Sequence, residues 1–104
     1  MYVTRAFTHQ AEFEAEAAQA ARSLGPEVVR VDTELGYDWA GEPSVFFMVI
    51  LDDAVTTEDR LLGVTNRVSR ALDEKTDPLE RWGLRPYFNF RARSEQDKID
   101  RRAA

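Results

Sequence analysis

The sequence predicts a single α+β domain of order αββαβ, in which a three-stranded sheet, an antiparallel hairpin plus one C-terminal strand, carries two helices on one face. Three observations predict this class. Apolar residues recur at helical spacing in two segments, they alternate with polar residues in two others, and residues 45–51 are apolar at both parities. At 104 residues the chain has room for one modest core. We expect the domain to span residues 1–94, with residues 95–104 as a polar tail or short helix.

Two segments have the apolar spacing of amphipathic helices. The first is predicted from Thr8, a suitable N-cap residue, to Leu24, where a glycine and a proline follow at once. The second begins at Thr56 or Thr57 and ends near Pro78, because proline restricts the residue before it. The buried stripes are Phe13, Ala17, Ala20 and Leu24 in the first helix, and Leu61, Val64, Val68, Ala71 and Leu72 in the second.

Three further segments are predicted as strands. Residues 29–39 alternate apolar and polar side chains, as in a half-buried strand, whereas residues 44–51 are apolar on both faces after the first position. The glycine and proline in residues 41–43 make an antiparallel hairpin the simplest connection between these strands. Residues 84–93 alternate again, and Pro86 favours an edge position or the beginning of that strand. With both helices on one face of the sheet, the other face is left bare.

The second strand is the main source of a functional hypothesis, because one of its two apolar parities has no predicted cover. We assign to the core the longer set, which is Val45, Phe47, Val49 and Leu51. Phe46, Met48 and Ile50 are then left for an interface, together with Tyr87 of the last strand. The assignment rests on parity, so a one-residue slip in register would exchange the two sets.

Composition and charge exclude several functional classes. The formal net charge is −5, which is the wrong average sign for a phosphate backbone or an anionic membrane. The chain has no cysteine and one histidine, His9, so thiolate metal sites, cysteine nucleophiles and a Ser-His-Asp triad are excluded. No uncharged apolar run approaches the ~20 residues that cross a bilayer. We therefore expect a cytoplasmic, non-enzymatic protein with no cofactor and no membrane contact.

Four carboxylates suggest one alternative, an enzyme that uses a hard cation. Asp32 and Glu34 lie on the polar parity of one predicted strand, and Asp52 and Asp53 follow the end of the next. Carboxylate oxygens are the ligands that Mg²⁺ prefers. The competing interpretation is that Asp32 and Glu34 form cross-strand ion pairs with the arginines of the last strand.

The last strand suggests a second alternative, an RNA-binding module. Tyr87 stands among Arg85, Arg91 and Arg93, which is the composition used to stack bases over a phosphate track. The net negative charge and the acidic first strand argue against nucleic acid, unless these two strands lie at opposite edges of the sheet.

Three short segments form a distinctive set: Asp38-Trp39-Ala40-Gly41-Glu42-Pro43, Leu51-Asp52-Asp53 and Gly83-Leu84-Arg85-Pro86-Tyr87-Phe88. The set resembles small uncharacterised bacterial proteins that share an Asp-Trp-x-Gly-acid-Pro turn and a Gly-Leu-x-Pro-Tyr strand start. The resemblance covers the chain roughly from the hairpin to Ser94, and its motifs carry turn chemistry more than active-site chemistry. It implies a non-enzymatic partner protein, of the antitoxin-like kind encoded beside small ribonuclease toxins.

The sequence thus predicts a protein-interaction module. The absence of catalytic residues and the uncovered parity of the second strand are the two observations that favour it. We expect a homo-oligomer, a homodimer being the simplest, or else a different protein partner. Residues 95–102 folding back over the sheet is the internal alternative to either partner.

Overall fold

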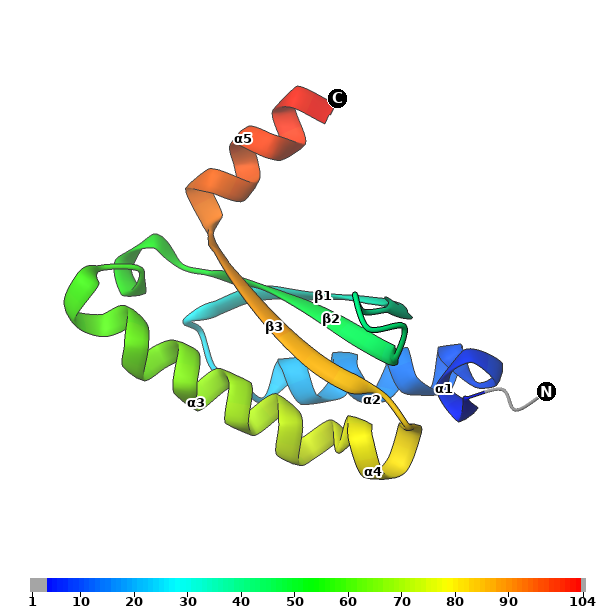
Figure 1. Cartoon of the computed structure of the whole chain (residues 1–104). Helices are drawn as coiled ribbons and strands as arrows, with labels where there is room; N and C mark the ends of the chain where they lie inside the picture. The colour runs from blue at the N-terminus through cyan, green and yellow to red at the C-terminus, as the bar shows by residue number, and fades with distance from the viewer. Residues whose placement is uncertain (1–3, 104) are drawn as a thin grey trace.

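The computed structural model describes residues 4–103 and has the α+β fold that the sequence predicts (Figure 1). Its helices and strands follow one another along the chain as α1 (Arg5–Thr8), α2 (Gln10–Arg22), β1 (Val28–Tyr37), β2 (Pro43–Leu51), the 3₁₀ turn η1 (Asp53–Val55), α3 (Glu58–Thr76), α4 (Pro78–Trp82), β3 (Arg85–Ala92) and α5 (Arg93–Ala103). The three strands form one mixed sheet in the order β1-β2-β3.

Strand β2 occupies the centre of the sheet. It pairs with β1 in an antiparallel hairpin, as predicted, and with β3 in parallel, so that α3 and α4 lie on the connection between β2 and β3. Strand β3 is an edge strand and Pro86 stands near its beginning. Both positions suit proline, because proline has no N–H to donate to a ladder of hydrogen bonds. Both edge strands therefore flank the same apolar central strand.

The core lies between the sheet and helices α2 and α3, which cover the same face (Figure 1). The predicted parity of β2 is confirmed, because all four residues assigned to the core are fully buried: Val45, Phe47, Val49 and Leu51. Aromatic contacts link neighbouring elements of the core, and Phe13 of α2 lies across the layers from Phe47 with 6.5 Å between ring centroids. Phe47 stacks on Phe88 of β3 at 5.1 Å between ring centroids, and Phe13 of α2 meets Trp82 edge-on at 5.4 Å.

The helical regions differ from the prediction at two places. The first predicted helix begins at Gln10 of α2 rather than at Thr8, and a short helix that was not predicted, α1, precedes it; His9 between the two has a backbone (φ −127°, ψ 41°) that is not helical. The predicted turn before the last strand contains a further short helix, α4. Asp77 adopts a left-handed conformation (φ 42°) that ends α3, and Pro78 then begins α4 at a position that suits proline. This extra turn places Trp82 in the core.

The first strand also departs from simple alternation. A register shift between Val28 and Arg30 leaves Val29 outside the ladder and 43% exposed, while Val28 and Val31 pack against the core. A bulge of this kind moves the residues before it to the opposite parity. At the other end of the strand Tyr37 is also exposed, where the alternation had predicted burial.

Candidate interaction face

The sheet face turned away from α2 and α3 is called here the open face. The pairing register arranges its residues in four rows of three, each row running from β1 through β2 to β3. The rows are Gly36, Ser44 and Arg85; Glu34, Phe46 and Tyr87; Asp32, Met48 and Asn89; and Arg30, Ile50 and Arg91. The centre of the face is thus largely apolar, and its charges lie on the two edge strands.

The predicted interface residues on β2 share this face but are not equally available. Phe46 and Met48 are half-buried, so part of each side chain reaches solvent. Ile50 departs from the prediction, because it is only 2% exposed in the single chain. Helix α5 contacts this end of β2, and its Gln96 is itself buried. Ile50 therefore belongs to the fold and offers a partner almost no surface.

Helix α5 leaves the end of β3 on the side of the sheet opposite α2 and α3 (Figure 1). Its first turn is tied to β3 by Arg91, whose Nη1 donates to Gln96 Oε1 at 2.6 Å and whose Nε lies 3.7 Å from Glu95 Oε2. Of the two predicted alternatives for the C-terminal residues, a polar tail or a short helix, the structure shows the helix. The helix contacts β2 and β3 at the Ile50 end of the open face and then projects away from the body of the protein.

Three aromatic rings form a continuous contact from the hairpin tip to the middle of the open face; we call them the aromatic ladder. Trp39 lies 5.4 Å from Tyr87, and Tyr87 stacks on Phe46 at 5.4 Å with an interplanar angle of 16°. Trp39 is 86% exposed. The predicted interface residue Tyr87 is thus held between the central apolar surface and an exposed tryptophan, which extends the apolar surface beyond the sheet.

Asp38 organises the hairpin tip next to this ladder. Its Oδ1 accepts the backbone N–H groups of Ala40 and Glu42, both at 2.9 Å, and its Oδ2 accepts the Tyr87 hydroxyl at 2.8 Å. Gly41 supplies the positive φ (81°) that the turn requires. The two motifs that carry the family resemblance, the turn and the strand start, are therefore joined by the hydrogen bond from Tyr87 to Asp38.

These hydrogen bonds shift the ionisation of both partners. The backbone N–H of Glu42, followed by the Tyr87 hydroxyl, holds the pKa of the Asp38 carboxyl below its ordinary value. The same bond raises the pKa of the Tyr87 hydroxyl, because loss of its proton would leave it facing the Asp38 carboxylate. At neutral pH the pair therefore consists of a carboxylate and a neutral phenol.

The charged residues of the open face differ in whether they are paired. Arg30 pairs with Asp32 on β1 at 3.1 Å, and Arg91 has Glu95 and Gln96. Glu34 and Arg85 form no ion pair within 4 Å in the part of the chain that the structure describes. Glu34 on β1 is thus without an ion pair among the described residues, whereas Arg85 on β3 lies beyond ion-pair distance but helps to lower the pKa of the Asp38 carboxyl.

The predicted cross-strand pairing of Asp32 and Glu34 with the arginines of the last strand is wrong. Strand β2 lies between β1 and β3, so the two sets of charges stand at opposite edges of the sheet. Two strand spacings, about 9.6 Å, separate them. Sequence alternation alone does not show which strand the C-terminal segment pairs with.

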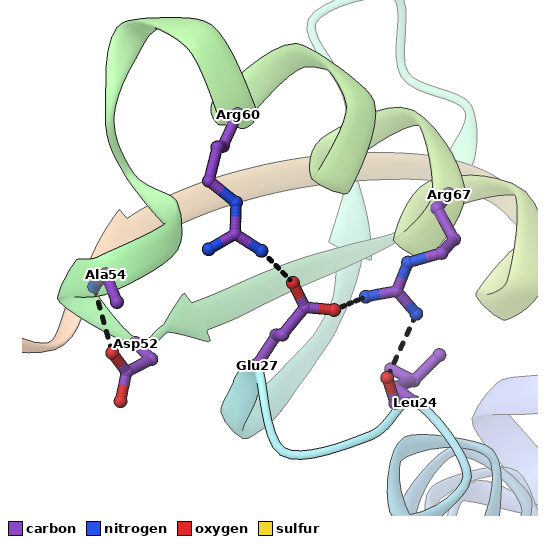
Figure 2. Close-up of polar contacts among 6 residues, drawn as sticks. All are labelled: Leu24, Glu27, Asp52, Ala54, Arg60 and Arg67. Carbon is purple, nitrogen blue, oxygen red and sulfur yellow. Dashed lines mark hydrogen bonds and ion pairs between the residues drawn. The ribbon is translucent and has the colours of Figure 1, made fainter.

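The four carboxylates of the metal alternative are not brought together. Asp32 and Glu34 lie on the open face, whereas Asp52 Oδ1 accepts the N–H of Ala54 (Figure 2) and Asp53 Oδ1 accepts the N–H of Ser94, at 2.9 and 3.0 Å. The Ser94 bond lowers the pKa of Asp53. Within residues 4–103, no group of three or more His, Asp or Glu side chains is placed to hold a metal ion.

The residues of the RNA-binding alternative are only partly assembled. Arg85, Tyr87 and Arg91 share the open face, but Arg93 is the first residue of α5. The ring of Tyr87 already contacts Phe46 and Trp39, and Arg91 is engaged with α5. A base would have to displace one of these rings to stack on Tyr87.

A second polar cluster, missed by the sequence reasoning, lies on the helix-covered side (Figure 2). Glu27 accepts hydrogen bonds from Arg60 at 3.1 Å and Arg67 at 2.6 Å, and Arg67 also donates to the Leu24 carbonyl at 3.1 Å. Arg60 and Arg67 stand seven residues apart on α3, a spacing that places both on one face. The cluster ties the loop before β1 to α3.

The fold defines a class of small α+β domains with a mixed three-stranded sheet, and similar solved structures exist. The chain is similar to the MamM CTD in its copper form (TM-score 0.60, 17% identity, covering 83% of this chain and 88% of that one). It is likewise similar to a Met-to-Leu variant of the MamM CTD (TM-score 0.59, 17% identity, 82% and 99% covered). At this identity the likeness shows the fold alone.

Comparison by sequence adds nothing to this likeness. No family model matches the chain, and no curated protein matches it. Within residues 4–103, every helix is too short or too polar to cross a bilayer.

Proposed function

We propose that this protein is a non-enzymatic interaction module that associates with a second copy of itself through the open face. The observation that carries the proposal is the surface formed by Phe46, Met48 and the aromatic ladder, which α2 and α3 leave uncovered. Trp39, with 86% of its surface exposed, is the largest single contribution. Exposed aromatic and methionine side chains of this kind are enriched at the centres of protein interfaces.

The chemistry of the face favours a protein over a small molecule or a nucleic acid. Its centre is apolar and its edges carry mixed charges, which is the pattern of an apolar interface core with a polar rim. Met48 suits such a surface because its thioether adapts to irregular partners. The mixed charge, with Glu34 and Asp32 facing solvent, would repel a phosphate backbone along one edge.

The family resemblance supports the same class of function. The shared turn and strand motifs build the hairpin tip beside the open face, through Asp38, Gly41 and Tyr87. An antitoxin-like protein would use this surface against a toxin in place of a second copy. The copper form of the MamM CTD raises metal binding as a further role, but no carboxylate or histidine cluster among residues 4–103 supports it here.

Sedimentation velocity over a range of protein concentrations tests the proposal. We expect the wild type to dimerise reversibly and Met48→Glu to sediment as a folded monomer, because a charge at the centre of the face must be desolvated on association. Met48→Leu is the matched control and should still dimerise. A wild type that stays monomeric at every concentration, or a Met48→Glu variant that dimerises as well as wild type, would overturn the proposal.

A further inference from the structure

A groove of about 760 Å³ lies between β3 and α3, and we propose that it binds an extended, basic segment of another protein, which adds to β3 as a fourth strand. The proposal goes beyond the proposed function and does not rest on it. One wall of the groove belongs to α3, on the helix-covered side, whereas the open face lies on the other side of the sheet (Figure 1). The two surfaces can therefore be tested separately.

The free edge of β3 supplies the main-chain partners for an added strand. Strand β3 pairs with β2 alone, so the edge turned away from β2 has no strand partner among residues 4–103. An edge of this kind presents unpaired N–H and C=O groups that a further strand can bind. Pro86 lacks an N–H near the beginning of β3, whereas residues 87–92 all have one. The second half of β3, which is the half beside the groove, is therefore the part that can pair.

The apolar lining of the groove suits the side chains of such a strand. Phe90 and Ala92 lie on the side of β3 that faces the helices, and both are half-buried. Helix α3 contributes Leu61 and Leu62 to the opposite wall. Leu61, which the sequence predicted to be buried, is 37% exposed, and Leu62 is 71% exposed. Because alternate side chains of a strand point to the same side, every second residue of the added strand would enter this apolar groove.

The charges that line the groove favour a basic segment. Glu58, in the first turn of α3, has no ion pair within 4 Å among residues 4–103. Glu95 of α5 also lines the groove and is 65% exposed. Arg91 is the cation of the lining, and it already donates to Gln96 at 2.6 Å and lies 3.7 Å from Glu95. The lining therefore has a net negative charge that a cationic segment would compensate.

The other cations of the neighbouring helices do not cancel this charge. Arg60 and Arg67 of α3 bind Glu27, which precedes β1. The cations of α5 follow Glu95 along a helix that leaves the body of the protein on the side opposite α3 (Figure 1). A segment that alternates apolar residues with lysine or arginine thus matches the free edge, the apolar lining and the charge of the groove together.

A short, acetylated and amidated peptide that alternates valine with lysine is the probe. Added to the wild type, it should shift the backbone amide NMR signals of Leu62, Phe90 and Ala92, and the shifts should saturate at or below millimolar peptide. A peptide that alternates valine with glutamate should bind about tenfold or more weakly, and the difference should shrink in high salt. The lysine peptide N-methylated at alternate residues should not bind, because its pairing edge has no N–H to donate.

Two variants separate the apolar contribution from the charge. Leu62→Gln removes an exposed apolar side chain without a change of charge, so it should weaken binding of the lysine peptide several-fold. Leu79→Gln, at a 58% exposed leucine of α4, is the matched control and should bind like wild type. Glu58→Gln should weaken binding a few-fold at low salt only, and Glu74→Gln, at an exposed position elsewhere on α3, should not.

The outcomes also separate this proposal from the proposed function. The groove is overturned as a strand-binding site if the lysine peptide gives no shifts at millimolar concentration, shifts only Phe46 and Met48, or binds equally well when N-methylated. Groove signals that move with protein concentration alone, and that the peptide does not reverse, would place a second copy there and overturn it as well. A wild type that stays monomeric but binds the peptide in the groove would overturn the proposed function and support this proposal.

Discussion

Phe46 and Phe47 are neighbours of the same residue type on the same central strand, yet they lie on opposite faces of the sheet. Phe47 is fully buried against α2 and stacks on Phe88, whereas Phe46 is half-buried and stacks on Tyr87, which reaches the exposed Trp39. One face is closed by helices α2 and α3 of the same chain, and the other, apart from the end that α5 contacts, is open to solvent. The comparison teaches that apolar character alone does not make a core residue, since a covering element is also required.

The largest expected effect on the free energy of unfolding comes from replacing each of the two phenylalanines with alanine. Phe47→Ala should lower the free energy of unfolding by about 3–5 kcal/mol, because it leaves a cavity in a closed core. Phe46→Ala should cost below about 2 kcal/mol, because its side chain is only partly removed from water. Urea unfolding of both variants, at concentrations too low for dimerisation, measures the difference. Equal losses would contradict the distinction between the two faces.

The parity of β2 was assigned from the longer β-favouring set alone, because residues 45–51 are apolar at both parities. That assignment places Val45 and Phe47 correctly in the core, although a one-residue slip in register would have reversed it. The hairpin was also predictable, since Gly41 and Pro43 have clear turn chemistry. The hairpin depends on a few adjacent residues, and its outcome does not require knowledge of distant contacts.

The features that were missed depend on contacts between distant segments. The position of β3 on the far side of β2 separates Asp32 from the arginines, and no periodicity encodes it. The bulge at Val29 and the burial of Ile50 beneath the start of α5 follow from how the sheet meets its neighbours. The candidate face was therefore predictable in its centre and incorrect at its α5 end.

A second expected effect separates affinity from stability on the open face. Trp39→Ala should leave the monomer's unfolding free energy within about 0.5 kcal/mol of wild type, because the ring is already mostly in water. Dimerisation should weaken about tenfold or more, since an exposed tryptophan beside an interface commonly contributes much of the binding energy. Leu79→Ala, at an exposed position on α4 away from the open face, is the control. Unchanged dimerisation would restrict the interface to the sheet.

A third expected effect concerns the ionisation of the hairpin tip. Because the pKa of Asp38 is lowered on folding, its hydrogen bonds stabilise the protein above the unfolded pKa of about 3.9, and this stabilisation is lost as the pH falls through the folded pKa. Tyr87→Phe removes one of these bonds, so the pKa of Asp38 should rise towards its ordinary value. An NMR titration of the Asp38 carboxyl measures the change.

The Tyr87→Phe variant should also differ from wild type in how its stability changes at alkaline pH. The raised pKa of Tyr87 means that wild-type stabilisation is complete below the unfolded pKa of about 10 and is lost as the pH rises through the folded pKa. Tyr87→Phe has no proton to lose at that position, so its stability should fall less steeply there. An Asp38 pKa that is the same in both proteins would show that the Glu42 and Ala40 N–H groups alone control it.

The smallest expected effect lies in the Glu27 cluster on the helix-covered side. All three side chains are substantially exposed, at 30% for Glu27, 50% for Arg60 and 46% for Arg67, so solvent screens the two ion pairs. Glu27→Gln should therefore lower the free energy of unfolding by less than about 1 kcal/mol, and the loss should shrink further in high salt. Glu74→Gln, at an exposed site on α3 with no ion pair among residues 4–103, is the matched control. Because the cluster is remote from the open face, Glu27→Gln should also dimerise like wild type. A change in dimerisation without a change in stability would move the interface to the helix-covered side, and the contrast between the two faces would then be wrong.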